Sequence, residues 1–159
     1  TKVEVINTDA EGRMLLADAL GYAKKYDPRL VIDVATLTGS AMRAIGTYGV
    51  VAMQKNAAQP FKALQESGEE VYERLVEFPM WKEYDEELKS EIADLKHLGG
   101  SNAGAITAGK FLEHFTGYPF IHLDIAGPAF LDKAFRYFTA GGTGITVRLL
   151  FNYLLHHIR

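Results

Sequence analysis

Two acidic residues and an arginine lie close together in the segment Asn7–Arg13, which reads N-T-D-A-E-G-R. Asp9 and Glu11 have one residue between them, so in a loop their carboxylates can converge on one point, and carboxylate oxygens suit Mg²⁺, Mn²⁺ and Zn²⁺. Gly12 permits the close approach of a neighbouring backbone. Arg13 supplies a fixed positive charge that can bind an anion or a developing oxyanion. The segment therefore predicts a site for divalent metal ions and an anion.

The same segment can also be interpreted as the start of a helix. Thr8 followed three residues later by Glu11 matches the pattern of a capping box. Asp9 would in addition face the positive end of the helix dipole, which is favourable for a carboxylate. Spacing alone favours this structural interpretation, so the choice depends on features elsewhere in the sequence.

The predicted elements on either side would place the segment Asn7–Arg13 at the end of a β-strand. Lys2–Ile6 alternates polar and apolar residues as a strand does, and Arg13–Tyr26 carries apolar residues at helical spacing. Arg29–Ala35 is a largely apolar run, typical of a strand buried on both faces. The other predicted strands are Tyr48–Met53, Glu91–Leu95 and Phe120–Ile125, and the other predicted helices are Ser40–Ile45, Ala57–Val76, Trp81–Leu88, Ala105–Phe115 and Ile145–His157.

This alternation of strands and helices predicts one α/β domain, a three-layer sandwich with a mixed, largely parallel central sheet flanked by helices. Ligands gather at the carboxyl ends of strands in such sheets, which is where the segment Asn7–Arg13 would lie.

Length and composition exclude several other classes of protein. The chain has 159 residues, enough for one compact domain, with a formal net charge of −3 and no cysteine. Because there is neither a basic patch nor a long apolar run, we expect no nucleic acid and no membrane as partner, and a cytoplasmic location fits. Without cysteine, no thiolate can act as a ligand or nucleophile. Thr1 directly precedes the first predicted strand, which suggests that the chain was cut from a longer protein.

The segment Asn7–Arg13 also resembles the signature of the leucyl aminopeptidase family of two-metal exopeptidases. Further blocks resemble that family in the same order along the chain: Leu15–Leu20, Thr36–Gly39, Asn102–Ala105, His122–Gly127 and Gly142–Gly144. Because the resemblance covers nearly the whole chain, it is specific. It favours metal binding over a helix start as the role of the two carboxylates.

The resemblance implies a metal centre and an anion site. Two divalent ions, Zn²⁺ or Mn²⁺ with Mg²⁺ as a further option, would lie side by side. Asp9 would bind one ion through its carboxylate and its backbone carbonyl, and Glu11 would bridge both ions. Arg13 would hold a bicarbonate-like anion that helps to move a proton from the attacking water.

The resemblance further implies peptide substrates with a leucine-like first residue. The loop that contains Thr36, Leu37 and Gly39 would bind the peptide backbone. Thr36, Gly39 and Ala126 would line an apolar pocket for the first side chain. Relatives form hexamers built as paired trimers, so we expect a homo-oligomer for the complete enzyme.

The match to the family's site is incomplete. The family's other ligands, a lysine and two aspartates, and its second catalytic lysine all precede the signature in chain order. Residues 1–159 would therefore be the C-terminal portion of the catalytic peptidase domain. Since each ion needs about four ligands, Asp9 and Glu11 cannot complete the site. We expect the isolated chain to be inactive or to bind metal weakly without the missing upstream part of the same protein.

Two other functions remain open on the residues alone. Gly99–Ala103 nearly fits the G-x-S-x-G elbow of serine hydrolases. Ser101, Asp124 and His156 follow in the chain order of that family's catalytic triad. Alternatively, the chain could be a non-catalytic assembly scaffold that uses its last helix and the aromatic run Phe130–Phe138 for contacts.

Three polar residues are open to a structural interpretation. His97 shows no ligand-type spacing, so the sequence favours a packed or surface histidine. Asp33 and Asp124 lie in apolar strands, where each could support a site or be a satisfied buried carboxylate.

Overall fold

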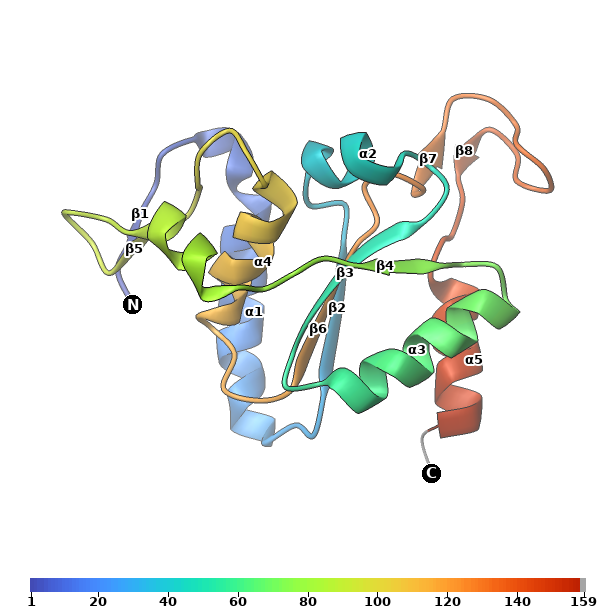
Figure 1. Ribbon diagram of the computed structural model, residues 1–159, viewed down its shortest axis with the longest axis horizontal. Helices are drawn as coiled ribbons and strands as arrows, with labels where there is room; N and C mark the ends of the chain where they lie inside the picture. Colours follow the sequence, from blue (N-terminus) through green and yellow to red (C-terminus); the bar gives the residue numbers. More distant parts are fainter. Residues whose placement is uncertain (158–159) are drawn as a thin grey trace.

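The computed structural model describes residues 1–157, and a four-stranded sheet lies at its centre (Figure 1). The strands lie in the order β2 (Val31–Ala35), β6 (Phe120–Asp124), β3 (Val50–Lys55) and β4 (Leu75–Glu77). β2 is parallel to β6 and β3 is parallel to β4, whereas β3 and β6 are antiparallel. The predicted mixed, largely parallel sheet is therefore confirmed.

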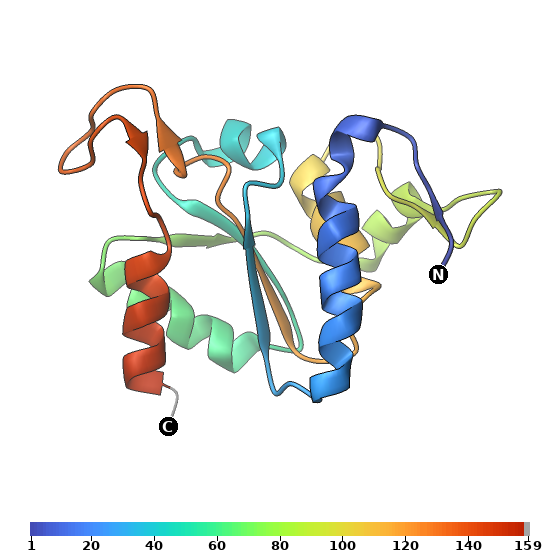
Figure 2. The same cartoon turned by 180° about the vertical axis from the view of Figure 1, so that it is seen from behind.

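Helices cover both faces of this sheet and give the predicted three layers (Figures 1 and 2). The α-helices are α1 (Gly12–Ala23), α2 (Gly39–Ile45), α3 (Ala58–Glu70), α4 (Gly104–Glu113) and α5 (Val147–His157), and the 3-10 helices are η1 (Thr8–Ala10), η2 (Lys24–Tyr26) and η3 (Lys82–Leu88). α1 and α4 enclose a core around Phe111 and Phe120, and α3 and α5 enclose another around Phe61 and Leu149. Across residues 1–157, no helix has the length and apolar character needed to cross a membrane.

β6 contributes to both cores because successive side chains of a strand point to opposite faces. Ile121 and Leu123 are fully buried in the core with α3 and α5, and Phe120 is fully buried in the core with α1 and α4. Burying one such side chain contributes about 1.5–3 kcal/mol. β6 is thus a rigid strand whose carboxyl end, at Asp124, can hold a site in place.

The structure differs from the sequence predictions at several elements. The predicted helix Ala57–Val76 is wrong beyond Glu70, because Tyr72 adopts a left-handed conformation (φ 61°) and the chain then enters β4. Arg29–Ala35 contains the strand β2, whose side chains pack against both cores as predicted, but β2 is an edge strand of the described sheet and its residues are only half-buried.

The first predicted strand shortens to β1 (Val3–Glu4), and it pairs in parallel with β5 (Leu95–Lys96) outside the central sheet. A hairpin of β7 (Phe130–Leu131) and β8 (Gly141–Gly142) was not predicted at all. Both pairs have strands of two residues, too short to show an alternating pattern in the sequence.

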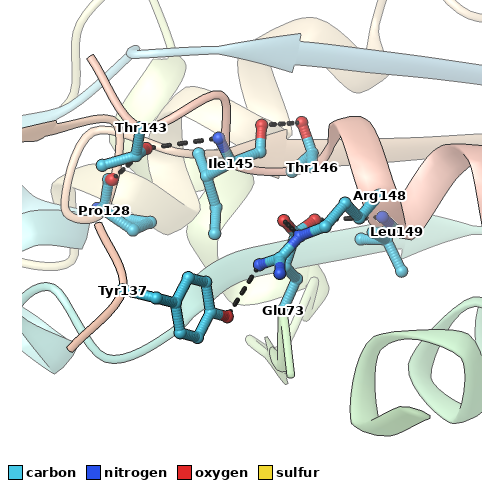
Figure 3. A network of polar contacts seen from close by, with 8 residues as sticks. All are labelled: Glu73, Pro128, Tyr137, Thr143, Ile145, Thr146, Arg148 and Leu149. Atoms are coloured by element: carbon cyan, nitrogen blue, oxygen red, sulfur yellow. Dashed lines mark hydrogen bonds and ion pairs between the residues drawn. The ribbon is translucent and has the colours of Figure 1, made fainter. Parts of the chain in front are cut away.

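A buried carboxylate ties the hairpin connection to α5 (Figure 3). The Glu73 side chain accepts hydrogen bonds from Arg148 Nε and from the backbone N–H of Leu149, both at 3.0 Å. Arg148 also donates to the hydroxyl of Tyr137 at 2.9 Å. Because Leu149 lies in the first turn of α5, Glu73 satisfies an otherwise free helix N–H. Arg148, which Glu73 holds, links α5 to Tyr137 in the segment between β7 and β8.

Candidate functional site

The segment Asn7–Arg13 forms η1 and the first turn of α1, and its two carboxylates are not used to build the helix. Asn7 caps η1, because its side chain accepts a hydrogen bond from the Asp9 N–H at 2.9 Å. Glu11 is the residue that precedes α1, and its side chain makes no capping hydrogen bond. The predicted capping box between Thr8 and Glu11 is therefore wrong. Both carboxylates are exposed and free to bind something else.

Arg13, in contrast, is buried directly behind these carboxylates. Only 5% of the residue is exposed, and its Nη1 donates to the His97 carbonyl at 2.8 Å. Its Nε is buried and has no hydrogen-bond partner within residues 1–157. Burial lowers the pKa of the guanidinium from its ordinary value, and the nearby Asp124 carboxylate opposes that shift. A buried cation with an unused N–H fits an anion that enters from outside the chain.

His97 fastens the segment to the rest of the fold, a role that the sequence did not predict. The imidazole is fully buried, its Nε2 lies 2.9 Å from the Asn7 carbonyl, and its Nδ1 lies 3.2 Å from the Ile6 N–H. These contacts fit a ring that donates from Nε2 and accepts at Nδ1. Because the His97 carbonyl also binds Arg13, one residue fixes both ends of the segment. Its partners lie about ninety positions away, so local spacing gave no sign of this role.

The loop between β2 and α2 is held by the carboxylate of Asp124 at the end of β6. Asp124 accepts from the Leu37 N–H at 3.1 Å, the Thr38 hydroxyl at 2.8 Å and the Ala126 N–H at 3.2 Å. Thr38 in turn caps α2 by accepting from the Ala41 N–H at 3.0 Å. The ambiguity about Asp124 is resolved: it is a buried, satisfied carboxylate that organises this loop.

The predicted substrate-binding residues lie next to the segment Asn7–Arg13, which is the predicted metal site. Gly12, at the start of α1, faces the side chain of Leu37, which packs into the core. Thr36 and Gly39 are exposed, and Ala126 is partly exposed. Asp9, Glu11 and Arg13 follow β1, in η1 and at the start of α1, whereas Thr36, Leu37, Gly39 and Ala126 follow β2 and β6. The approach of Gly12 to Leu37 is what brings the two groups together.

Gly127, directly after Ala126, is required for close packing against the end of α2. A Cβ at this position would collide with the backbone carbonyl of Gly46. We expect Gly127→Ala to lower the free energy of unfolding by about 2–3 kcal/mol, measured by urea unfolding. Gly142→Ala is the matched control, since its Cβ would meet nothing within 4 Å. Equal stability of the two variants would contradict the close packing.

The alternative serine triad is not assembled. Both oxygens of Asp124 are taken by the loop contacts described above. Ser101 lies on the exposed loop before α4, and His156 lies on α5, which packs on the opposite face of the sheet from α4 (Figure 1). The serine hydrolase hypothesis is therefore not favoured.

The donor set fits part of a metal site. Asp9 and Glu11 offer exposed carboxylate oxygens, the ligand type preferred by hard divalent ions and accepted by zinc. Within residues 1–157, no group of three or more His, Cys, Asp or Glu side chains is placed to hold a metal ion. These two residues could thus contribute to a metal centre that requires further ligands.

The order of these loops along the chain matches one known family. The sequence model of the cytosol aminopeptidase family, catalytic domain, matches residues 1–151. The chain belongs to the cytosol aminopeptidase family. A probable cytosol aminopeptidase from Geobacter sulfurreducens is 49% identical over 158 residues, which are 99% of this chain and 32% of that protein. The one from Chlorobium phaeobacteroides is 50% identical over 155 residues, 96% of this chain and 30% of that protein.

A solved structure shows that the similarity to the family extends to the fold. A mutant of tomato leucine aminopeptidase superimposes with a TM-score of 0.88 at 39% sequence identity, covering 96% of this chain and 30% of that structure. The chain thus spans about a third of the length of these members of the cytosol aminopeptidase family.

Proposed function

We propose that this chain forms part of the active site of a metal-dependent aminopeptidase that removes leucine-like residues from the N-terminus of peptides. One observation carries the proposal. Two exposed carboxylates, Asp9 and Glu11, are left free by the fold directly beside the buried, incompletely bonded Arg13. Carboxylates of this kind can hold a metal ion that activates a water for hydrolysis, and a buried guanidinium beside them can hold an anion that takes part in proton transfer.

In this proposal Asp9 and Glu11 would hold two divalent ions, Zn²⁺ or Mn²⁺ or else Mg²⁺, together with ligands from the upstream part of the protein. When bound, such ions lower the pKa of a shared water and polarise the substrate carbonyl. Arg13 would hold a bicarbonate-like anion, a group that can take up a proton from the attacking water. Since burial strips water from the guanidinium, its attraction for an anion is stronger than at an exposed site.

The substrate would lie along the loop at the end of β2. The N–H of Leu37 is already bonded to Asp124, so Leu37 offers its carbonyl to the free amino group or the peptide N–H. Thr36, Gly39 and Ala126 are small and accessible, and they would form the walls of the first side-chain pocket. An apolar pocket of this kind favours leucine over charged residues by burial.

We further propose that residues 1–159 are the C-terminal portion of the catalytic domain and that upstream residues supply the remaining ligands. Supporting this, the chain covers about a third of its relatives, and the described residues hold no cluster of three metal-ligating side chains. Titration of the isolated chain with Mn²⁺ in a calorimeter is expected to show weak binding or none. Tight binding of two ions per chain would contradict this division of the site.

Chelation tests the function itself on the full-length protein. We expect a chelator to abolish hydrolysis of leucine p-nitroanilide and Zn²⁺ or Mn²⁺ to restore it, because the nucleophile depends on the metal. A serine-directed phosphonate should leave the activity intact. Activity that survives chelation but is lost to the phosphonate would reverse the assignment in favour of a serine hydrolase.

Assembly into a hexamer and a cytoplasmic location complete the proposal. α5 exposes apolar side chains at Val147, Phe151, Leu154 and Leu155, which an oligomer could cover. A scaffold role without catalysis would use the same surface, but it would not explain why the carboxylates of Asp9 and Glu11 are left unbonded. The mass of the full-length protein in solution tests the assembly.

A further inference from the structure

We infer that Asp124 is the positioning residue of the substrate site, and this inference rests on the proposed function. Asp124 is 1% exposed and accepts three hydrogen bonds from two different chain segments. Two come from Leu37 and Thr38 in the loop after β2, and the third comes from Ala126 after β6. The two segments proposed to line the substrate pocket are therefore joined through a single carboxylate.

Through Thr38, Asp124 also influences the position of α2. The Thr38 hydroxyl donates to Asp124 and accepts from the Ala41 N–H, so the loop conformation and the start of α2 depend on each other. Hydrogen bonds to an ionised carboxylate are stronger than neutral ones, and burial strengthens them further. The loop is thus held rigid before any substrate arrives.

The loop that Asp124 holds contains three of the residues proposed to bind the substrate, Thr36, Leu37 and Gly39. Asp124 contacts this loop at its centre, through Leu37 and Thr38. Release of the loop would therefore disturb substrate binding more than the proposed metal ligands Asp9 and Glu11, which lie in a different segment.

Two variants of the full-length protein separate positioning from simple structural support. Asp124→Asn keeps the volume and removes the charge, and Thr38→Val keeps the carboxylate but removes the hydroxyl that joins it to the start of α2. Glu73→Gln is the matched control, because Glu73 is an equally buried carboxylate that also accepts a backbone N–H but lies at α5. The measurements are kcat and KM for leucine p-nitroanilide, Mn²⁺ affinity by calorimetry, and amide exchange of residues 36–41.

We expect KM to rise about tenfold in Asp124→Asn and by less in Thr38→Val, because the loop proposed to bind the substrate loses the hydrogen bonds that order it, and substrate binding must then order it again. Amide exchange at residues 36–41 should become faster in both variants, with Mn²⁺ affinity unchanged. Glu73→Gln should leave KM unchanged and speed exchange only in the first turn of α5.

Unchanged KM in both variants, or exchange at residues 36–41 as slow as in the wild type, would overturn the inference. If the wild type hydrolyses no aminoacyl anilide, the proposed function fails, and the exchange measurement then decides by itself whether Asp124 holds the loop. Should Asp124→Asn not fold, Thr38→Val gives the same test.

Discussion

Replacing Glu11 with glutamine is expected to lower kcat/KM of the full-length protein for leucine p-nitroanilide by roughly 10³-fold, because a neutral amide cannot bridge two cations. The calorimetric affinity for Mn²⁺ should fall in parallel. The thermal stability of the metal-free protein should stay within about 0.5 kcal/mol of the wild type, since the Glu11 side chain is exposed and makes no capping hydrogen bond.

Asp18→Asn is the control for the Glu11 variant. Asp18 is also exposed and lies on the same helix, α1, but away from the candidate site. It should retain wild-type activity and metal affinity. A Glu11→Gln protein with full activity and unchanged Mn²⁺ binding would remove the main support for the metal centre.

Replacing His122 with leucine is expected to lower the free energy of unfolding by about 3 kcal/mol, because it leaves the Asp33 carboxylate without its partner in the interior. His122 is fully buried on β6, and its Nδ1 lies 2.8 Å from Asp33 Oδ2 on the neighbouring strand β2. Its Nε2 has no hydrogen-bond partner within residues 1–157, so the replacement removes only the contact with Asp33. For a domain of this size the loss corresponds to a fall in Tm of roughly 10 °C.

The double variant Asp33→Val with His122→Leu tests this cause. Replacing a buried polar pair by apolar side chains of similar volume is nearly neutral, so we expect stability to return to within about 1.5 kcal/mol of the wild type. A double variant that is no more stable than His122→Leu alone would show that the lower free energy of unfolding comes from poorer packing and not from the unpaired Asp33 carboxylate.

The sequence predicted the layers of the fold because long elements carry strong periodic patterns. α1, β3, β6 and α5 were all found to within a few residues. The errors occur where tertiary contacts decide the conformation. The turn at Tyr72 ends a polar helix so that Glu73 can reach the start of α5, a contact between residues 76 positions apart. No local pattern reports such a contact.

The candidate site was predicted unevenly for the same reason. Asp9, Glu11 and Arg13 lie within one short segment, so their resemblance to a known signature was visible in the sequence. His97 and Asp124 act on residues more than eighty positions away, through side-chain contacts to backbone groups. The capping-box pattern was misleading because Asn7 supplied the cap that Thr8 was expected to provide.

Two of the three hydrogen bonds that Asp124 accepts come from main-chain N–H groups, those of Leu37 and Ala126. Every amino acid except proline carries this group, so the anchoring does not depend on which side chains stand at these positions. Substitutions of these side chains should therefore leave the loop in place. The residues proposed to line the substrate pocket can then vary independently of the framework that holds them.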